Sequence, residues 1–340
     1  MKIFFFTTVF APSIGGIERM AEMLCAEFVA MGHEVQLATL TPGNGRFPYP
    51  VIRRPKFTQF LSLLHWCDIH IQANVSLKYA WPLLVVPKKV VYRYANAYQR
   101  DDGSRSLIDF AKVALAARAC GIANSHYTAA RTGATHVVLN AYDDSTFRIT
   151  TPWQERKRDL VFLGRLVSQK GCDTLLQALA HLRGQGLFPT LTVIGDGPDR
   201  PMLETMSAEL NLDRQIHFTG TMQGQPLADL LNCHRFMVVP SRYEEPFGIV
   251  ALEGLACGCV PIVSERGGLV DAISGHGFTF PNGDPIALAK VLTECLHRPE
   301  EAQQRLVGAE SHLARCRARS VAEQYINIFR QKIGESSCSK

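Results

Sequence analysis

The stretch Asp159-LVFLGRLVSQK-Gly171 decides the fold of this chain. An apolar run predicts a buried strand at 159–164, and an amphipathic helix is expected directly after it at 172–183. The strand-then-helix pattern repeats to the end of the domain, which is typical of a doubly wound parallel sheet. The other predicted strands lie at 190–194, 215–219, 235–240 and 259–263, and the other predicted helices at 198–210, 225–232, 248–256, 268–274 and 284–297.

Residues upstream of this stretch carry the same alternation. Strands are predicted at 3–9, 34–40, 68–73, 89–93, 120–124 and 136–139, and helices at 17–31, 104–118 and 126–133. The segment 42–66 is rich in Pro, Gly and aromatic residues without a clear period, so we expect a loop-rich surface insertion there.

A change of character at 140–158 predicts a linker between two domains. We therefore expect a Rossmann-like domain at 1–150 and a second one at 151–310. Ligands of such sheets bind at the carboxyl ends of the strands, so two facing ends would form a central cleft. A last helix near 301–333 is expected, with its part at 311–333 packing across both domains.

Size and composition favour a soluble protein with two cores. The chain has 340 residues, of which 46% are hydrophobic and 20% charged, with a mean hydropathy of zero. The apolar run Ile3-Phe4-Phe5-Phe6 is better explained by a buried strand than by a secretory signal, because no small-residue cleavage site follows cleanly. Ten cysteines without Cys-x-x-Cys spacing fit a reducing cytosol, and Cys257 and Cys259 are expected to be small buried residues rather than metal ligands.

The positive charge is concentrated in the N-terminal half. Residues 1–150 carry 16 Lys and Arg against 10 Asp and Glu. Such a surface would attract anionic lipid head groups or an acidic acceptor, and ordinary solvated charge is the alternative. Much of the excess comes from Arg53, Arg54, Lys56, Lys88, Lys89, Arg93, Arg100 and Arg105, which are interleaved with aromatic residues.

Gly15-Gly16-Ile17-Glu18 follows the first predicted strand and opens a helix. Adjacent glycines let backbone amides approach a ligand, and a helix start favours phosphate. A Gly-x-Gly-x-x-Gly dinucleotide fingerprint is absent at this position, which disfavours a nicotinamide cofactor.

Two further glycine loops follow strands of the second domain. Gly164-Arg165 and Lys170-Gly171 place two cations where they would neutralise a diphosphate leaving group. Gly195, in Ile194-Gly195-Asp196-Gly197-Pro198, lets the backbone pass near a planar ring, although a tight turn would need the same residues.

The segment Glu245-PFGIVAL-Glu253 places two carboxylates at the start of a helix and inside it. Glu253 lies about five residues into the helix, which is roughly 7 to 8 Å along its axis. One carboxylate can accept hydrogen bonds from sugar hydroxyls and the other from ribose, while amides around Phe247, Gly248 and Ile249 face phosphates.

Together these motifs resemble glycosyltransferase family 4 over nearly the whole chain. The matching segments are GGIE at 15–18, GRLVSQKG at 164–171, IGDGP at 194–198, EPFG with Glu-x7-Glu at 245–253, and ACGCVPIVSERGG at 256–268. The resemblance implies a GT-B fold with an acceptor-binding N-terminal domain, a donor-binding C-terminal domain and no bound metal or cofactor. It also implies a UDP-, GDP- or ADP-sugar donor, gripped with help from Gly15, Gly16, Gly164 and Gly195, and retention of anomeric configuration.

The resemblance also implies roles for single residues. Arg165 and Lys170 stabilise the departing diphosphate, Glu245 lies beside the donor sugar, and Glu253 holds ribose. Many relatives carry a histidine after a first-domain strand, but this sequence has none in Val90-VYRYA-Asn96, so Glu18, Arg93, Tyr94 and Asn96 are the acceptor-side candidates. His126 is expected to be structural or exposed.

We therefore expect a retaining hexosyltransferase that uses a saccharide or lipid-linked acceptor in envelope polysaccharide or lipopolysaccharide assembly. It would be cytoplasmic, with a possible peripheral contact to the inner membrane face and no nucleic-acid partner. The alternatives are a non-catalytic sugar-nucleotide-binding or scaffold protein and a GT-B-like nucleotide-sugar epimerase.

Overall fold

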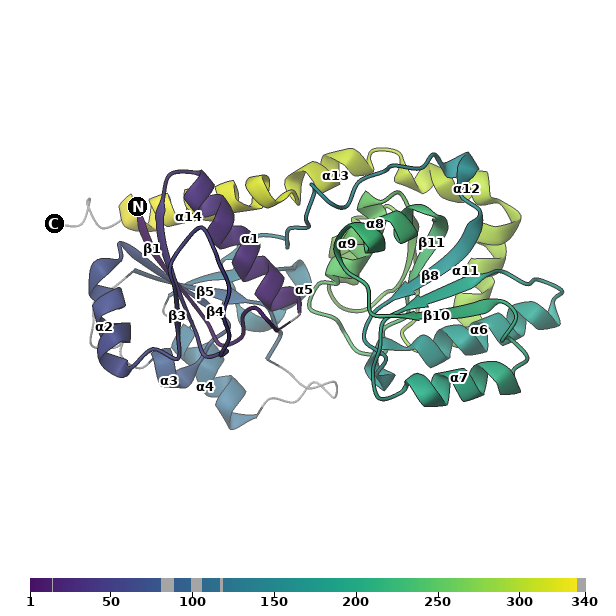
Figure 1. Cartoon of the computed structure of the whole chain (residues 1–340), viewed down its shortest axis with the longest axis horizontal. Helices are drawn as coiled ribbons and strands as arrows, with labels where there is room; N and C mark the ends of the chain where they lie inside the picture. The colour runs from purple at the N-terminus through teal and green to yellow at the C-terminus, as the bar shows by residue number, and fades with distance from the viewer. Residues whose placement is uncertain (14, 81–88, 99–105, 117–118, 335–340) are drawn as a thin grey trace. The chain divides into compact units, whose positions relative to one another are not determined.

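The computed structural model describes residues 1–13, 15–80, 89–98, 106–116 and 119–334. The chain forms two compact units (Figure 1). Unit 1 combines Met1–Ala141 with Arg315–Lys340, and unit 2 holds Tyr142–Ala314. Lys88, Arg100 and Arg105 of the basic set and the ends of the helix predicted at 104–118 lie outside the described residues.

Unit 1 contains a seven-stranded parallel sheet in the order β3-β2-β1-β4-β5-β6-β7. Its strands are β1 (Lys2–Thr7), β2 (Glu34–Thr39), β3 (Val51–Arg53), β4 (Ile69–Ala73), β5 (Lys89–Tyr94), β6 (Cys120–Ala123) and β7 (His136–Val137). Its helices are α1 (Gly16–Ala30), α2 (Phe57–Trp66), α3 (Leu77–Ala80), α4 (Leu107–Ala116), α5 (His126–Thr132) and α14 (Ala318–Gly334).

The predicted buried first strand is confirmed as β1, an inner strand of this sheet between β2 and β4. Strands of a parallel sheet are covered on both faces, so they tolerate a continuous apolar run. Phe4 and Phe6 are two residues apart and share one face, where both rings meet Phe60 of α2 with centroids 5.3 and 5.5 Å away. These aromatic contacts fix α2 against the sheet.

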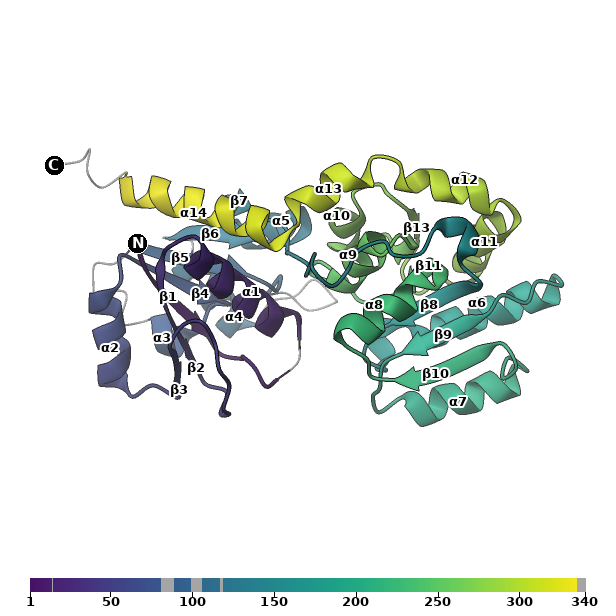
Figure 2. The ribbon, with the colours of Figure 1, turned by 45° about the horizontal axis from the view of Figure 1, so that its top comes forward.

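The last helix, α14, packs on α1 within unit 1 (Figure 2). Phe28 of α1 meets the rings of Tyr325 and Phe329 at 6.4 and 5.7 Å. Lys89 donates a hydrogen bond to the carbonyl of Ile333 at 2.5 Å. Packing of this helix across both domains stays a prediction.

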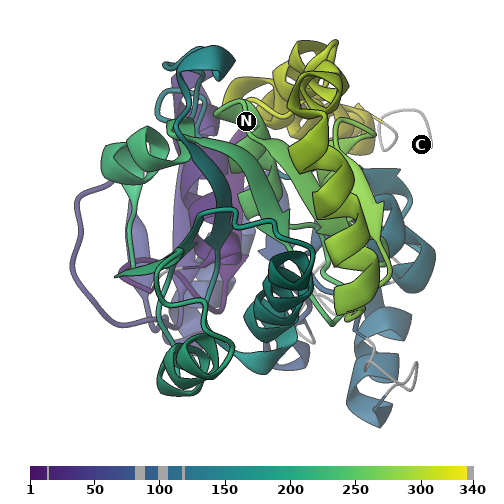
Figure 3. The same ribbon diagram turned by 90° about the vertical axis from the view of Figure 1, so that its right-hand side faces the viewer.

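Unit 2 contains a six-stranded parallel sheet in the order β10-β9-β8-β11-β12-β13, with helices along both of its faces (Figure 3). Its strands are β8 (Arg158–Leu163), β9 (Leu191–Ile194), β10 (Ile216–Gly220), β11 (His234–Val239), β12 (Val260–Ser264) and β13 (Phe278–Phe280). Its helices are α6 (Cys172–Gly184), α7 (Arg200–Glu209), α8 (Gly224–Asn232), α9 (Ile249–Ala256), α10 (Leu269–Ile273), α11 (Pro285–His297), α12 (Pro299–Gln303) and α13 (Ala309–Arg315).

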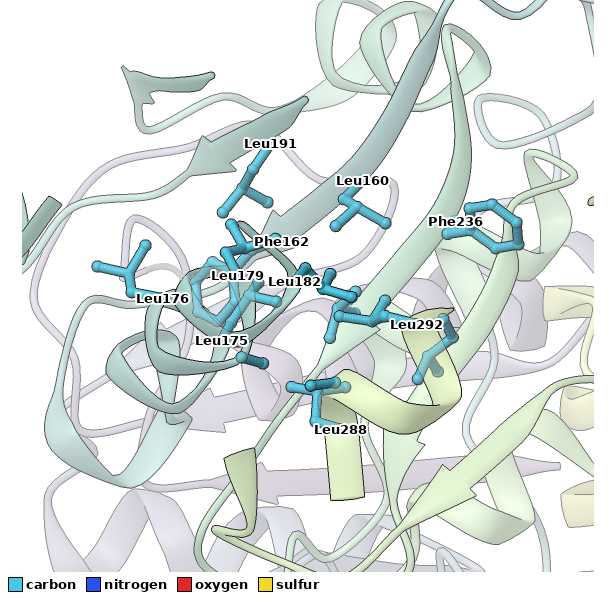
Figure 4. Packing of buried hydrophobic residues seen from close by; sticks show 14 of the residues in the cluster. Leu160, Phe162, Leu175, Leu176, Leu179, Leu182, Leu191, Phe236, Leu288 and Leu292 are labelled. Atoms are coloured by element: carbon cyan, nitrogen blue, oxygen red, sulfur yellow. The ribbon is translucent and has the colours of Figure 1, made fainter. Parts of the chain in front are cut away.

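The main core of unit 2 lies on one face of this sheet, beneath α6 and α11 (Figure 4). Leucines of α6 recur at helical spacing and meet Leu288 and Leu292 of α11 and Phe236 of β11. The next residue, Met237, points to the opposite face, where its side chain lies against Gly254 of α9. Glycine at 254 therefore lets α9 lie close to the sheet.

Two predictions of local structure are wrong. The segment 42–66 is not a loop throughout, because it contains β3 and the amphipathic helix α2, whose Phe60 and Leu64 are buried. The helix expected near 301–333 is instead α12, a 3-10 turn at Gln304–Leu306, α13 and α14. Gly308, with φ +83°, separates the first part from α13, since this conformation does not continue a helix.

Candidate active site

Three loops of unit 2 meet at the carboxyl edge of its sheet. They follow β8, β9 and β11, and β8 lies between the other two strands. Parallel strands end at the same edge, so the loops at Gly164–Lys170, Gly195–Gly197 and Ser241–Glu245 are neighbours. The sequence placed its second-domain candidate residues on these loops and on the start of α9.

Lys170 and Glu245 form the central contact of this edge. The Lys170 Nζ donates to Glu245 Oε1 at 2.9 Å. Glu245 is 5% exposed, and its Oε1 also accepts a short hydrogen bond from the Ser241 hydroxyl. The structure thus brings together two of the three residues that the sequence singled out as catalytic.

Tyr243 holds the other side of the Lys170 ammonium. Lys170 Nζ lies 3.3 Å from the Tyr243 hydroxyl oxygen and 5.2 Å from the ring centroid. Burial lowers the pKa of Lys170, but the Glu245 charge and the Tyr243 phenol outweigh burial and raise this pKa above its usual value. Burial and the Glu245 charge also raise the pKa of Tyr243. At neutral pH the site therefore holds an ammonium ion beside a neutral phenol.

The loop that carries Lys170 is locked by its backbone. Ser168–Lys170 forms a 3-10 turn that ends at Gly171 with φ +68°. A Cβ atom at Gly171 would collide with the carbonyl oxygen of Pro240, so only glycine lets the two loops approach.

Arg242 clamps the same loop from the other side. Its backbone N–H donates to the carbonyl of Gln169 at 2.9 Å, and its guanidinium contacts Ser168, Thr174 and the carboxylate of Asp173. Arg242 thereby ties the end of β11 to the start of α6, on both sides of Lys170.

The backbone around Glu245 is anchored to the loop after β12. Glu245 forms a parallel bridge with Gly267 and accepts a hydrogen bond from the Gly268 N–H at 2.6 Å. Gly248, with φ +97°, then reverses the chain into α9, and a Cβ atom there would strike Leu269. The glycines of this segment therefore set where Glu245 points.

The other donor-side candidates surround this core. Phe247 is buried, Ile249 begins α9, and Glu253 lies inside α9 with 3% exposure. Buried carboxylates need polar partners, and Glu253 has interactions of this kind within the protein.

The glycine loops after β8 and β9 touch through their backbones. A Cβ atom at Gly195 would collide with the carbonyl of Gly164, and the Leu166 N–H donates to the Asp196 carbonyl at 2.9 Å. Arg165 is exposed on this loop, and its charge lowers the pKa of Tyr243 against the effect of burial. The third catalytic candidate therefore lies within electrostatic reach of the Lys170 site.

The candidates of unit 1 occupy two places. Gly15 caps α1, which begins at Gly16, and the Glu18 side chain folds back to the position that a Cβ atom on Gly15 would occupy. Arg93 and Tyr94, at the end of β5, have buried side chains.

Arg93 points away from solvent and donates to Asn140 Oδ1 at 2.6 Å. Tyr94 packs in the core beside Gly121. Asn96 alone of these three is exposed, and His126 is exposed at the start of α5 as expected.

Ser241, Arg242 and Tyr243 were not predicted as site residues. They follow β11 directly, so their place at the end of a strand was the available signal. Their partners lie 4 to 74 residues away in the sequence, which no local pattern reveals.

Cys257 and Cys259 are buried, as predicted. The Arg156 guanidinium donates to the carbonyl of Cys257 at 2.6 Å and to that of His234 at 2.7 Å, which holds this turn in place. No group of three or more His, Cys, Asp or Glu suited to a metal ion occurs within the described residues. None of the described helices is both long and apolar enough to span a membrane.

Comparison with known proteins places this site in a family. The family model for glycosyl transferases group 1 matches residues 143–309. An uncharacterized glycosyltransferase of Methanocaldococcus jannaschii is 32% identical over 149 residues, which cover 40% of this chain and only 38% of the relative.

Two longer similarities extend over both units. A GDP-mannose-dependent alpha-(1-6)-phosphatidylinositol dimannoside mannosyltransferase of Mycobacterium tuberculosis is 25% identical over 90% of each chain. The crystal structure of Anabaena HepE in complex with UDP and glucose superposes with a TM-score of 0.73 at 19% identity, covering all of both chains. The expected GT-B fold is thereby confirmed, and the segment 143–309, which contains this site, matches the glycosyl transferases group 1 family.

Proposed function

We propose that this protein is a retaining glycosyltransferase that moves a hexose from a nucleoside-diphosphate sugar to a saccharide or lipid-linked acceptor. The observation that carries the proposal is the Lys170–Glu245 ion pair at the carboxyl edge of the unit 2 sheet. Catalysis of this transfer needs a cation beside the leaving diphosphate and a carboxylate beside the sugar, and this pair supplies both within 2.9 Å.

The proposed step breaks the bond between the sugar C1 and the diphosphate oxygen, whose electron pair leaves with the diphosphate. Lys170 and Arg165 neutralise the charge that develops on this oxygen. The acceptor hydroxyl oxygen bonds to C1 from the same face and passes its proton to the departing diphosphate, which keeps the anomeric configuration.

The remaining donor-side residues bind and orient in this proposal. Glu245 accepts hydrogen bonds from sugar hydroxyls, and Glu253 accepts them from ribose. Backbone amides at Phe247, Gly248 and Ile249 face the phosphates from the start of α9. Acceptor recognition is assigned to unit 1, with Asn96 as its exposed candidate.

The names of two similar proteins support the choice of substrates. HepE binds UDP and glucose, and the mycobacterial relative acts on a phosphatidylinositol dimannoside, which is a lipid-linked saccharide. We propose an acceptor of this class and a role in envelope polysaccharide or lipopolysaccharide assembly.

A peripheral contact with an anionic membrane is part of this proposal. Unit 1 contains α4, whose first turn exposes Leu107 by 90%, Phe110 by 63% and also Ile108. Exposed apolar side chains on a basic domain favour a lipid surface. Flotation with vesicles of phosphatidylcholine and phosphatidylglycerol tests this contact, with Leu107→Ser/Phe110→Ser as the variant and Phe188→Ser in unit 2 as a matched control.

The activity is tested by incubation with UDP-, GDP- and ADP-sugars and candidate acceptors, while release of the nucleoside diphosphate is followed. Lys170→Ala and Glu245→Ala are expected to abolish release, whereas Lys290→Ala on the exposed side of α11 is expected to behave as wild type. Nuclear magnetic resonance of the product reports its anomeric configuration. Donor binding without any hydrolysis or transfer would instead favour a non-catalytic sugar-nucleotide-binding protein.

A further inference from the structure

In the donor site of unit 2, the positive charge of Lys170 is already paired with the negative charge of Glu245. The Lys170 ammonium, which the proposed function assigns to the diphosphate, donates to Glu245 Oε1 and contacts the Tyr243 hydroxyl. Glu245, which that function assigns to the sugar, accepts from Lys170 and Ser241 on the same oxygen. A diphosphate must therefore compete with Glu245 for the ammonium.

We propose that the Lys170–Glu245 ion pair is a resting state that the donor diphosphate opens, with Ser241 and Tyr243 as positioning residues that keep the two separated charges in place. This inference rests on the proposed function. Once the ammonium turns to the diphosphate, Tyr243 still contacts it, and Ser241 still donates to the released carboxylate.

The backbones that carry Lys170 and Glu245 are both held in place by other residues, so only the two side chains can move. Arg242 holds the Lys170 loop through Gln169, Ser168 and Asp173, and the contact of Gly171 with Pro240 closes the same loop. Gly267 and Gly268 hold the backbone of Glu245. The exchange therefore needs only rotation of the Lys170 and Glu245 side chains between fixed backbones.

A resting ion pair has opposite effects on the affinity for a bare diphosphate and on the affinity for the intact sugar donor. Glu245 opposes the binding of a bare diphosphate, because the diphosphate gains Lys170 only by displacing the carboxylate. For a donor that carries a sugar, the free energy spent in breaking the ion pair is recovered, because the released Glu245 then contacts the sugar hydroxyls. The pair thereby favours the intact donor over the spent nucleotide, which promotes product release.

Isothermal titration calorimetry with inorganic pyrophosphate, UDP and GDP tests this inference. Glu245→Gln is expected to bind pyrophosphate about tenfold more tightly than wild type, although it loses transferase activity. Glu244→Gln removes the same charge from the adjacent residue and is expected to change the affinity by less than about twofold.

A double-mutant cycle separates the ion pair from general electrostatics. In a Lys170→Met background the Glu245→Gln substitution is expected to give no gain in pyrophosphate affinity, because the cation that it frees is absent. Tyr243→Phe is expected to weaken pyrophosphate binding several-fold while circular dichroism stays that of wild type, and this variant tests the inference even if Glu245→Gln does not fold.

Unchanged or weaker pyrophosphate binding by a folded Glu245→Gln, or an equal gain from Glu244→Gln, would overturn the inference. Neither result touches the proposed function, whose transferase activity is excluded if wild type releases no nucleoside diphosphate from any donor. Pyrophosphate affinity thus tests the resting ion pair, whereas nucleoside diphosphate release tests the transferase activity.

Discussion

Lys170 and Glu245 lie 75 residues apart in the sequence, yet their Nζ and Oε1 atoms are 2.9 Å apart. The pair joins the loop after β8 to the loop after β11, two neighbouring strands of one parallel sheet. The positions of the two side chains depend on backbone turns at Gly171 and Gly248, which both have positive φ.

Replacement of Lys170 by arginine is expected to lower kcat for transfer at least about tenfold, and replacement by alanine at least about a hundredfold. A planar guanidinium does not fit the place of a compact ammonium between Tyr243 and Glu245. Initial rates of nucleoside diphosphate release measure the effect. Full activity of Lys170→Arg would mean that charge alone is required at this position.

Gly171→Ala is expected to lower the free energy of unfolding by at least about 2 kcal/mol more than Gly186→Ala. Both glycines have positive φ, at +68° and +79°, but a Cβ atom strikes Pro240 only at position 171 and meets nothing within 4 Å at position 186. Chemical denaturation compares the two variants. Equal losses would show that the approach of the two loops does not require glycine.

Glu253→Ala is expected to weaken binding of the free nucleoside diphosphate about tenfold or more, with little change in the preference between donor sugars. Glu253 is buried within α9 and is assigned to ribose, not to the sugar. Calorimetry measures the affinity, and Glu300→Ala on α12 serves as an exposed control. An unchanged affinity would exclude the ribose assignment.

The stability of both units is expected to fall as pH decreases below about 6.5. Burial lowers the pKa of His70 to about 3 and that of His234 to about 4, so the folded protein keeps both rings neutral where the unfolded chain binds protons. Their contribution is complete above pH 6.5 and is lost as pH falls toward the folded pKa, by up to about 1.4 kcal/mol per pH unit for each histidine.

Denaturation at pH 7 and pH 5 measures this loss. His234→Gln is expected to reduce the pH dependence of unit 2, and His70→Gln that of unit 1. A pH dependence that is the same in both variants and in wild type would contradict the assignment.

Much of the fold could be predicted from the sequence, because parallel strands that are buried on both faces consist of continuous apolar runs. The prediction failed at 42–66, where Pro and Gly residues obscured the helical spacing of Phe60 and Leu64. It also failed after Pro299, since the positive φ of Gly308 that separates the helices there was not foreseen.

The candidate site could be predicted only in part. Glu245, Arg165 and Lys170 occur in motifs at strand ends, but their roles stay predictions. Ser241 and Tyr243 were missed because hydroxyl groups gain significance only from the charges that the fold brings beside them. The contacts of Arg93 were likewise hidden, since its side chain turns inward to Asn140 rather than toward solvent.

Unit 1 is assembled from both ends of the chain, whereas unit 2 is one continuous segment. On the ribosome, unit 2 is therefore complete while unit 1 still lacks α14, whose Tyr325 and Phe329 cover Phe28. During synthesis, part of the apolar surface of unit 1, including Phe28, therefore stays exposed until α14 has been made. We expect unit 1 to be more prone to aggregation than unit 2 in the nascent chain.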